Sequence, residues 1–141
     1  MKYEKKGTNG GLDYEVYHFV FGTAVEISEE IFEVSKCFPR EKYHLIDQVR
    51  SHSRLVCTNL AEAWRVKEEE SIFTNKLSDA AQAASKTQTC LELASKHNFI
   101  GREIFQKIDS KYEDIFELLC DGTKHIHQRI YNFSMRPPAT K

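Results

Sequence analysis

Along most of this chain, apolar side chains recur at alternating steps of three and four residues, and this period constrains the fold more than any other feature. Such steps gather side chains on one face of an α-helix, whereas a half-buried strand alternates every second residue. No proline lies between Pro39 and Pro137, so nothing in that span forces a helix to break. The first seam is Tyr17, Val20, Ala24, Ile27, Ile31, Val34 and Phe38. The sequence therefore predicts an all-α protein.

Three further seams follow, separated by short polar connections. Pro39 ends the first helix, RVKEEES separates the second from the third, and Asn98 is a candidate left-handed cap of the third. The last seam continues in phase through Gly122, although Asp121-Gly122 is also a turn signal. The seams consist of Ile46, Val49, Ser53, Val56, Leu60 and Ala63; Phe73, Leu77, Ala80, Ala84, Thr87, Leu91 and Ala94; and Phe105, Ile108, Tyr112, Ile115, Leu119, Gly122, Ile126 and Ile130.

Four long helices with short connections predict an antiparallel up-down-up-down four-helix bundle. The helices are expected at residues 13–37, 40–65, 69–97 and 102–132. With 141 residues, one domain is the default. The predicted organisation is a flexible arm at 1–12, the bundle at 13–133 and a tail at 134–141.

Composition limits the setting and the partners. The formal net charge is −1, so a surface that binds a polyanion must be local. No signal peptide and no run of about 18 apolar residues is visible, so no membrane span is expected. The cysteines form no C-x-x-C pair, which favours a reduced cytoplasmic setting, with a four-thiolate metal site as the alternative. These cysteines are Cys37, Cys57, Cys90 and Cys120.

Two Glu-x-x-His pairs, Glu15 to His18 and Glu41 to His44, have the spacing used by bundles that hold two metal ions. They fall near the starts of two antiparallel helices, so they are expected at opposite ends and cannot share one site. His125 and His127 point to different faces if the helix continues. We therefore predict no metal, no cofactor and no catalytic residue. Helical RNases of the HEPN class use an Arg and a His with four to six residues between them, and that pattern is absent, because Arg40 and His44 have only three between them.

A second apolar stripe lies beside the main seam on two of the helices. It comprises Phe21, Val25 and Phe32, with Phe19 nearby, and then Ile104, Phe116 and Leu118. One interpretation is a wide core face, and the other is a subunit interface.

Polar candidates lie on the second helix. Asn59 and Glu62 are one turn apart. In one interpretation they cap the helix or pair across the bundle, with an ion pair between Glu62 and Arg65. In the other, they line a surface between subunits of an oligomer. Arg50 and Arg54, with Gln48, form either a solvated face or a phosphate contact.

The charge is most asymmetric at the end of the chain. No Asp or Glu occurs from Gly122 to Lys141. Cations interleaved with aromatics suit RNA or single-stranded DNA, and also suit a plain helix C-terminus. The nucleic-acid candidates here are Lys124, His125, His127, Arg129 and Arg136. The first helix is acidic instead, with Glu26, Glu29, Glu30 and Glu33.

The stretch FPREKYHLIDQVRSHSRLVCTNLAEAW, residues 38–64, resembles a bacterial family of four-helix-bundle proteins named for intervening sequences in 23S ribosomal RNA genes. The family's run reads approximately F-P-x-x-E-x-Y-x-L-x-x-Q-x-R-R and then N-I-A-E-G. Matching positions are Phe38, Pro39, Tyr43, Leu45, Gln48, Arg50, Asn59, Ala61 and Glu62. The chain departs from the pattern at Ser51, Ala63 and Lys86, and lacks one residue between Pro39 and Tyr43.

The resemblance implies a ring of five subunits. The related accessory variability proteins of diversity-generating retroelements have a similar bundle, assist a reverse transcriptase and bind nucleic acid. The implied partners are therefore further copies of the chain, a protein such as a reverse transcriptase or another neighbouring-gene product, and RNA or DNA.

Our leading hypothesis is a non-enzymatic, self-assembling accessory or scaffold protein for a protein or ribonucleoprotein partner. The alternative is direct binding of RNA or single-stranded DNA through the basic C-terminal segment. A helical nuclease is the third hypothesis.

Overall fold

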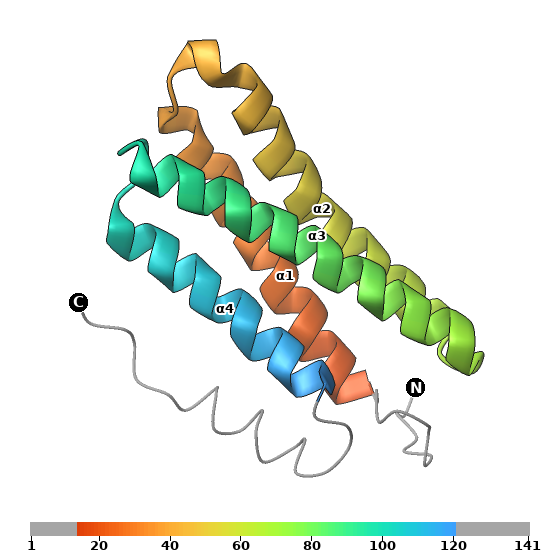
Figure 1. Cartoon of the computed structure of the whole chain (residues 1–141). Coiled ribbons are helices and arrows are strands. Elements are labelled where there is room, and N and C mark those ends of the chain that lie inside the picture. Colours follow the sequence, from red (N-terminus) through yellow and green to blue (C-terminus); the bar gives the residue numbers. More distant parts are fainter. Residues whose placement is uncertain (1–13, 121–141) are drawn as a thin grey trace.

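The computed structural model describes residues 14–120, which form four α-helices joined by short connections. The helices are α1 (Tyr14–Val34), α2 (Tyr43–Arg65), α3 (Glu70–Lys96) and α4 (Arg102–Cys120), and the short 3-10 helices η2 (Ser35–Cys37) and η3 (Arg40–Lys42) turn the corner between α1 and α2. Consecutive helices run in opposite directions (Figure 1), and no strand occurs in this part of the chain. The predicted antiparallel up-down-up-down four-helix bundle is confirmed.

Several expectations fall on residues that the structure does not describe. These are the arm at 1–12, the tail at 134–141 and the continuation of the fourth helix through Gly122 to residue 132. They stay predictions.

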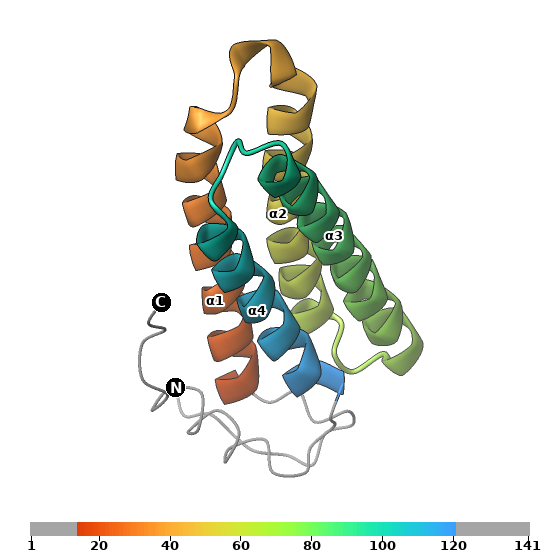
Figure 2. The ribbon, with the colours of Figure 1, turned by 60° about the vertical axis from the view of Figure 1, so that its left-hand side comes forward.

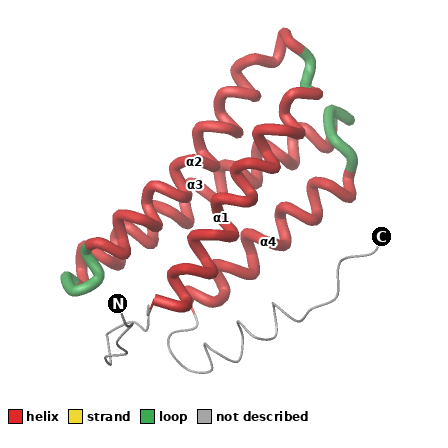
Figure 3. The backbone as a smooth tube through the Cα atoms, turned by 180° about the vertical axis from the view of Figure 1, so that it is seen from behind, coloured by secondary structure: helices red, strands yellow, loops and turns green. Residues whose placement is uncertain are grey.

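Each helix contacts two neighbours, in the order α1, α2, α3, α4 and back to α1 (Figure 2). The most extensive contact joins α2 and α3. Small buried side chains at Ala80, Ala83 and Ala84 let the α3 backbone approach its neighbours closely. Toward the turn at residues 66–69, the α2–α3 hairpin diverges from α1 and α4, as seen from both sides (Figures 1 and 3). The bundle is therefore tightest along α2 and α3.

The buried side chains are largely those of the predicted seams, and the differences lie near helix ends. Val16, at 1% exposure, takes the buried place expected of the half-buried Tyr17. Leu118 of the second stripe is fully buried, as the wide-core interpretation expects, whereas the seam residue Leu119 is only half-buried. A helix has 3.6 residues per turn rather than the 3.5 of a strict heptad, so the core-facing line drifts by about 20° every seven residues, and near a helix end a neighbouring residue can lie closer to the core.

The end of α3 is closed by a backbone motif around Asn98. Asn98 has a positive φ of 64°, which confirms the predicted left-handed cap. The Phe99 N–H donates to the Ala94 carbonyl at 2.8 Å, and the Asn98 N–H donates to the Ser95 carbonyl at 3.0 Å. This pair of bonds is the Schellman pattern, which satisfies carbonyls that the helix end leaves open. The turn into α4 is therefore fixed by backbone geometry.

Cys37, Cys57 and Cys90 are free cysteines, and the last two are removed from solvent. Cys57 is half-buried, and desolvation raises the pKa of its thiol to about 11. Cys90 is buried, and desolvation likewise raises its pKa. Because the thiolate is the reactive form, these thiols act as small core side chains rather than nucleophiles.

Tyr112 places a hydroxyl in the core. Its side chain is 1% exposed, and its oxygen has no hydrogen-bond partner among the described residues. Burial raises the pKa of the Tyr112 hydroxyl well above its usual range, and the nearby Thr87 side chain opposes this by a smaller amount. The Thr87 hydroxyl instead donates to the Ala83 carbonyl at 2.8 Å. Tyr112 therefore contributes ring packing while its hydroxyl opposes folding.

We predict that Tyr112→Phe raises the free energy of unfolding by about 1 kcal/mol, because it removes an unsatisfied buried hydroxyl and keeps the ring. Tyr112→Ala is expected to lower it by about 3–5 kcal/mol through loss of packing. Urea denaturation followed by circular dichroism measures both. A clear loss of stability in Tyr112→Phe would show that the hydroxyl has a partner that stabilises the fold.

Candidate functional site

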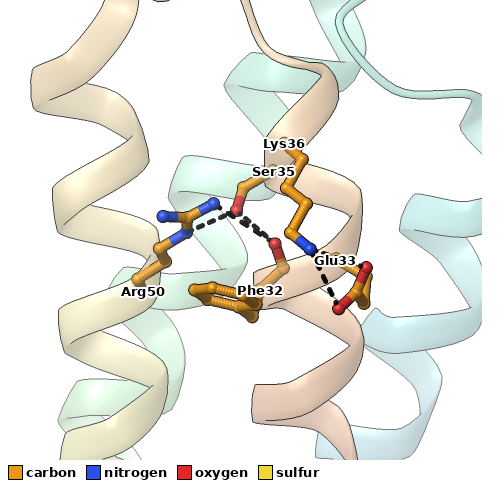
Figure 4. Close-up of polar contacts among 5 residues, drawn as sticks. All are labelled: Phe32, Glu33, Ser35, Lys36 and Arg50. Atoms are coloured by element: carbon orange, nitrogen blue, oxygen red, sulfur yellow. Dashed lines mark hydrogen bonds and ion pairs between the residues drawn. The ribbon is translucent and has the colours of Figure 1, made fainter.

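The outer face of α1 and α2 carries a cluster built around Arg50 (Figure 4). The Arg50 Nε donates to Ser35 Oγ at 2.7 Å, and its Nη2 donates to the Phe32 carbonyl at 3.3 Å. The guanidinium carbon also lies 4.3 Å from the centre of the Phe32 ring. The Ser35 hydroxyl donates to the same carbonyl at 3.1 Å. The cluster therefore joins the end of α1 to α2.

Arg50 is well suited to this position because the last carbonyls of α1 carry partial negative charge. A cation at a helix C-terminus is favourable, and the guanidinium fork binds a hydroxyl and a carbonyl together. Ser35 is fully buried, so its oxygen needs the partners that Arg50 and Phe32 supply. The structure thus gives Arg50 an internal role, while a phosphate contact by Arg50 stays a prediction.

Beside this cluster lies a groove of about 370 Å³. Its lining residues are Ser28, Glu29, Phe32 and Glu33 from α1 and Arg50 and Arg54 from α2. Glu33 pairs with Lys36 at 3.2 Å. Arg54 is exposed and makes no hydrogen bond or ion pair through its side chain within residues 14–120. One wall is therefore acidic, the other basic, and an aromatic ring lies between them.

The ring of Phe32 remains 44% exposed despite its contact with Arg50. Lys36 Nζ also lies 5.1 Å from the ring centre, so two cations border the same aromatic side chain. Leu55 on α2 is 44% exposed as well. Of the two, Phe32 lines the groove, and exposed apolar surface rimmed by polar residues is typical of contact surfaces.

The other residues of the second stripe are divided between the two interpretations. Phe21, Phe19 and Phe116 are partly buried and pack against the core, as the wide-core interpretation expects. Val25 is half-buried, and Ile104 is 38% exposed. Their part in an oligomer interface stays a prediction.

At the far end of α1, aromatic rings join α1 to α2. The Tyr17 and Trp64 rings are stacked with centroids 4.7 Å apart, and Phe21 stacks on Tyr17 at 5.5 Å. Lys67 Nζ lies 4.0 Å from the centre of the Trp64 ring. These contacts explain why Tyr17 and Phe21 are only half-buried and still ordered by packing.

Asn59 and Glu62 have partners within the chain. The Asn59 amide donates to the Leu55 carbonyl at 3.0 Å. Glu62 pairs with Lys76 of α3 at 2.8 Å, so pairing across the bundle is confirmed, but its predicted partner Arg65 was wrong. Because α3 packs directly against α2, Lys76 reaches the carboxylate. An additional role in subunit contact stays a prediction.

The two Glu-x-x-His pairs lie at opposite ends of the bundle, as Figure 1 shows for the start of α1 and the start of α2. All four side chains are exposed. Within the described residues, no group of three or more His, Cys, Asp or Glu side chains could hold a metal ion. His125, His127 and the cationic candidates Lys124, Arg129 and Arg136 lie outside that part of the chain.

Sequence reasoning missed Ser35, Leu55 and Ser95. Ser35 follows Ile31 by four residues and so lies in phase with the core, and a serine there signals a hydroxyl that needs a buried partner. Leu55 lies outside the seam of its helix, and nothing in the sequence marks it as a contact residue. The role of Ser95 depends on the turn that follows it.

The model of the family described as 23S rRNA-intervening sequence protein matches residues 18–121. The chain belongs to this family. A crystal structure of a protein with unknown function from the S23 ribosomal protein family of Bacteroides thetaiotaomicron VPI-5482 is similar, with a TM-score of 0.65 and 25% sequence identity. The match covers 74% of this chain and 98% of that one. No curated protein matches.

Family membership confirms the resemblance inferred from residues 38–64 and agrees with the four-helix fold. It assigns no activity, because the similar structure is itself described as having unknown function. No helix within residues 14–120 combines the length and hydropathy needed to cross a bilayer.

We predict that Arg50→Ala lowers the free energy of unfolding by about 1–2 kcal/mol, because two hydrogen bonds and the ring contact are lost together. Arg50→Lys should recover only part of this, since an ammonium cannot form the fork. Arg54→Ala is the matched control and should change stability by less than about 0.5 kcal/mol. Equal effects at both positions in urea denaturation would contradict the internal role of Arg50.

Proposed function

We propose that the protein is a non-enzymatic, self-assembling helical-bundle scaffold that serves as an accessory to a protein or ribonucleoprotein partner. The observation that carries the proposal is the half-exposed ring of Phe32, held by Arg50 at the edge of a groove with one acidic and one basic wall. This surface is the candidate contact with a second copy of the chain.

Its composition supports that use. Aromatic and arginine side chains carry much of the binding energy at protein interfaces, especially where their rotamers are already fixed. Arg50 is held by two hydrogen bonds and in turn restricts the Phe32 ring, so little side-chain entropy is lost on contact. The groove is therefore prepared for binding before a partner arrives.

The charges favour a second copy as the occupant. Glu29 and Glu33 face the groove from α1, and Arg54 faces it from α2 without an internal partner in the described part. A copy of the same chain brings both signs of charge, so each wall can meet its opposite. The ring of five subunits implied by the family resemblance is one assembly of this kind.

The buried chemistry supports a structural role. The thiols of Cys57 and Cys90 have raised pKa values, lie in or against the core and do not line the groove. A nucleophile needs the opposite, a lowered pKa and access to substrate. The groove residues instead combine a ring, two cations and two carboxylates in an arrangement suited to protein contact.

We predict that Phe32→Ser weakens self-association by about tenfold or more, because the ring is the apolar centre of the contact. Glu29→Arg should also weaken it by adding a third cation to the groove. Leu93→Ser is the matched control, since Leu93 is 47% exposed but lies on α3 away from the groove. Sedimentation velocity measures association, and circular dichroism checks the fold. Identical association for Phe32→Ser and Leu93→Ser would contradict the proposal.

Direct binding of RNA or single-stranded DNA is the second candidate, favoured by the exposed and unpaired Arg54. We predict that removing residues 124–141 abolishes salt-sensitive binding, whereas Arg54→Gln weakens it modestly, because phosphate contacts release counterions. Fluorescence anisotropy of a labelled RNA at several salt concentrations measures this. Binding that persists in the shortened chain would place the contact elsewhere.

A further inference from the structure

A second pocket, separate from the α1–α2 groove, lies at the turn between α3 and α4. It has a volume of about 340 Å³ and is lined by Ser95, Asn98, Phe99, Ile100, Gly101 and Arg102. No family description or comparison assigns a role to this place. Its walls combine the end of one helix with the start of the next.

The start of α4 presents backbone donors to this pocket. The first bond of the helix runs from the Phe105 N–H to the Gly101 carbonyl at 3.1 Å, so Gly101 is the N-cap. The N–H groups of Arg102, Glu103 and Ile104 have no hydrogen-bond acceptor within the helix, because no helical carbonyl lies four residues before them. Most N-cap residues supply a side-chain oxygen to such donors, and glycine has none. These donors are therefore available to an external acceptor.

Ser95 supplies the second observation. Its side chain is only 7% exposed, yet it lines the pocket, and its hydroxyl makes no hydrogen bond within the described residues. The Ser95 oxygen is not among the fully buried polar atoms that lack a partner, so it keeps access to solvent at the pocket that Ser95 lines and is available to a ligand there.

The pocket is built on rigid elements. The Schellman bonds around Asn98 fix the exit from α3. Ile100 is 8% exposed, and the Phe99 ring lies 5.9 Å from that of Phe38, so the turn is anchored on both sides. The donors and the Ser95 hydroxyl are thus held in place before a ligand binds.

The charge of this end of the bundle favours an anion. Residues 36–43 and 95–103 contain Lys36, Arg40, Lys42, Lys96 and Arg102 against Glu41 and Glu103. At the opposite end, residues 14–18 and 62–70 contain Glu15, Glu62, Glu68, Glu69 and Glu70 against Arg65 and Lys67. The helix dipole of α4 adds positive potential at its N-terminus. The basic end and the pocket therefore coincide.

The geometry points to a phosphate-binding site in this pocket, at the junction of α3 and α4. Backbone N–H groups of the first turn of α4 and the Ser95 hydroxyl donate to the phosphate oxygens, as at other helix N-termini that bind anions. Arg102 lines the same pocket, with its guanidinium carbon 5.5 Å from the centre of the Phe105 ring, and its positive charge favours an anion there. Glu103 is exposed, does not line the pocket and opposes binding by its charge.

The test uses the full chain and inorganic phosphate, titrated at constant ionic strength and followed by ¹H–¹⁵N NMR. Saturable shifts of the Arg102, Glu103 and Ile104 amide signals are expected. Ser95→Ala and Arg102→Gln should each weaken binding by roughly tenfold, and Glu103→Gln should strengthen it. A nucleoside monophosphate and a short single-stranded RNA, titrated in parallel, distinguish a free phosphate ester from a nucleic-acid backbone as the source.

Gly101→Asp is the decisive variant, because an aspartate at the N-cap fills the same donors from within the chain. A Cβ at Gly101 meets nothing within 4 Å, so the variant should fold and melt at a higher temperature while losing phosphate binding. Gly22→Asp is the matched control, as Gly22 is equally open but lies in α1. Absence of saturable shifts at residues 102–104, or equal binding by both aspartate variants, would overturn the proposal.

Discussion

The side chains that the four helices bury between them are the constraint on which the rest of the structure depends. Ile27 and Ile31 of α1, Val56 of α2, Leu91 of α3 and Ile108 of α4 lie on this shared line. Each such side chain stabilises the fold by about 1.5–3 kcal/mol when it leaves water. Because every helix must turn its apolar face toward the shared core, the positions of the turns and of the solvent-facing helix surfaces are largely fixed.

Once the core is filled, the outer faces and the ends determine what the molecule can contact. Arg50 ties the end of α1 to α2 and holds the Phe32 ring at the surface. The α3–α4 turn holds Ser95 and the first donors of α4 in a fixed pocket. The proposed self-association and the proposed phosphate site therefore use different faces, and each can fail without the other.

The fold was largely predictable because its determinants are local. The period of three and four gave the bounds of the first three helices and the start of the fourth within a few residues, and Asn98 was identified as a cap because asparagine tolerates a positive φ. The choice between Leu118 and Leu119 could not be made in this way, because both lie close to the line set by Ile115. Only packing against neighbouring helices decides which of the two is buried.

The candidate sites were less predictable because they depend on pairs far apart in sequence. The match of Arg50 to the family's run indicated that it matters, but not that its partners are Ser35 and the Phe32 carbonyl. Glu62 was assigned to Arg65 by helical spacing, and Lys76 takes that place because α3 packs alongside. The Ser95 pocket appears only when the α3 cap and the start of α4 are placed together.

The central claim is that this bundle assembles with copies of itself through its outer α1–α2 face. The most direct test is the solution mass of the unmodified chain, measured by light scattering at low and high salt. The account predicts a discrete multiple of the 16.4 kDa chain that persists at high salt, with five subunits as the multiple that the family resemblance implies. A mass of one chain at both salt concentrations would contradict it.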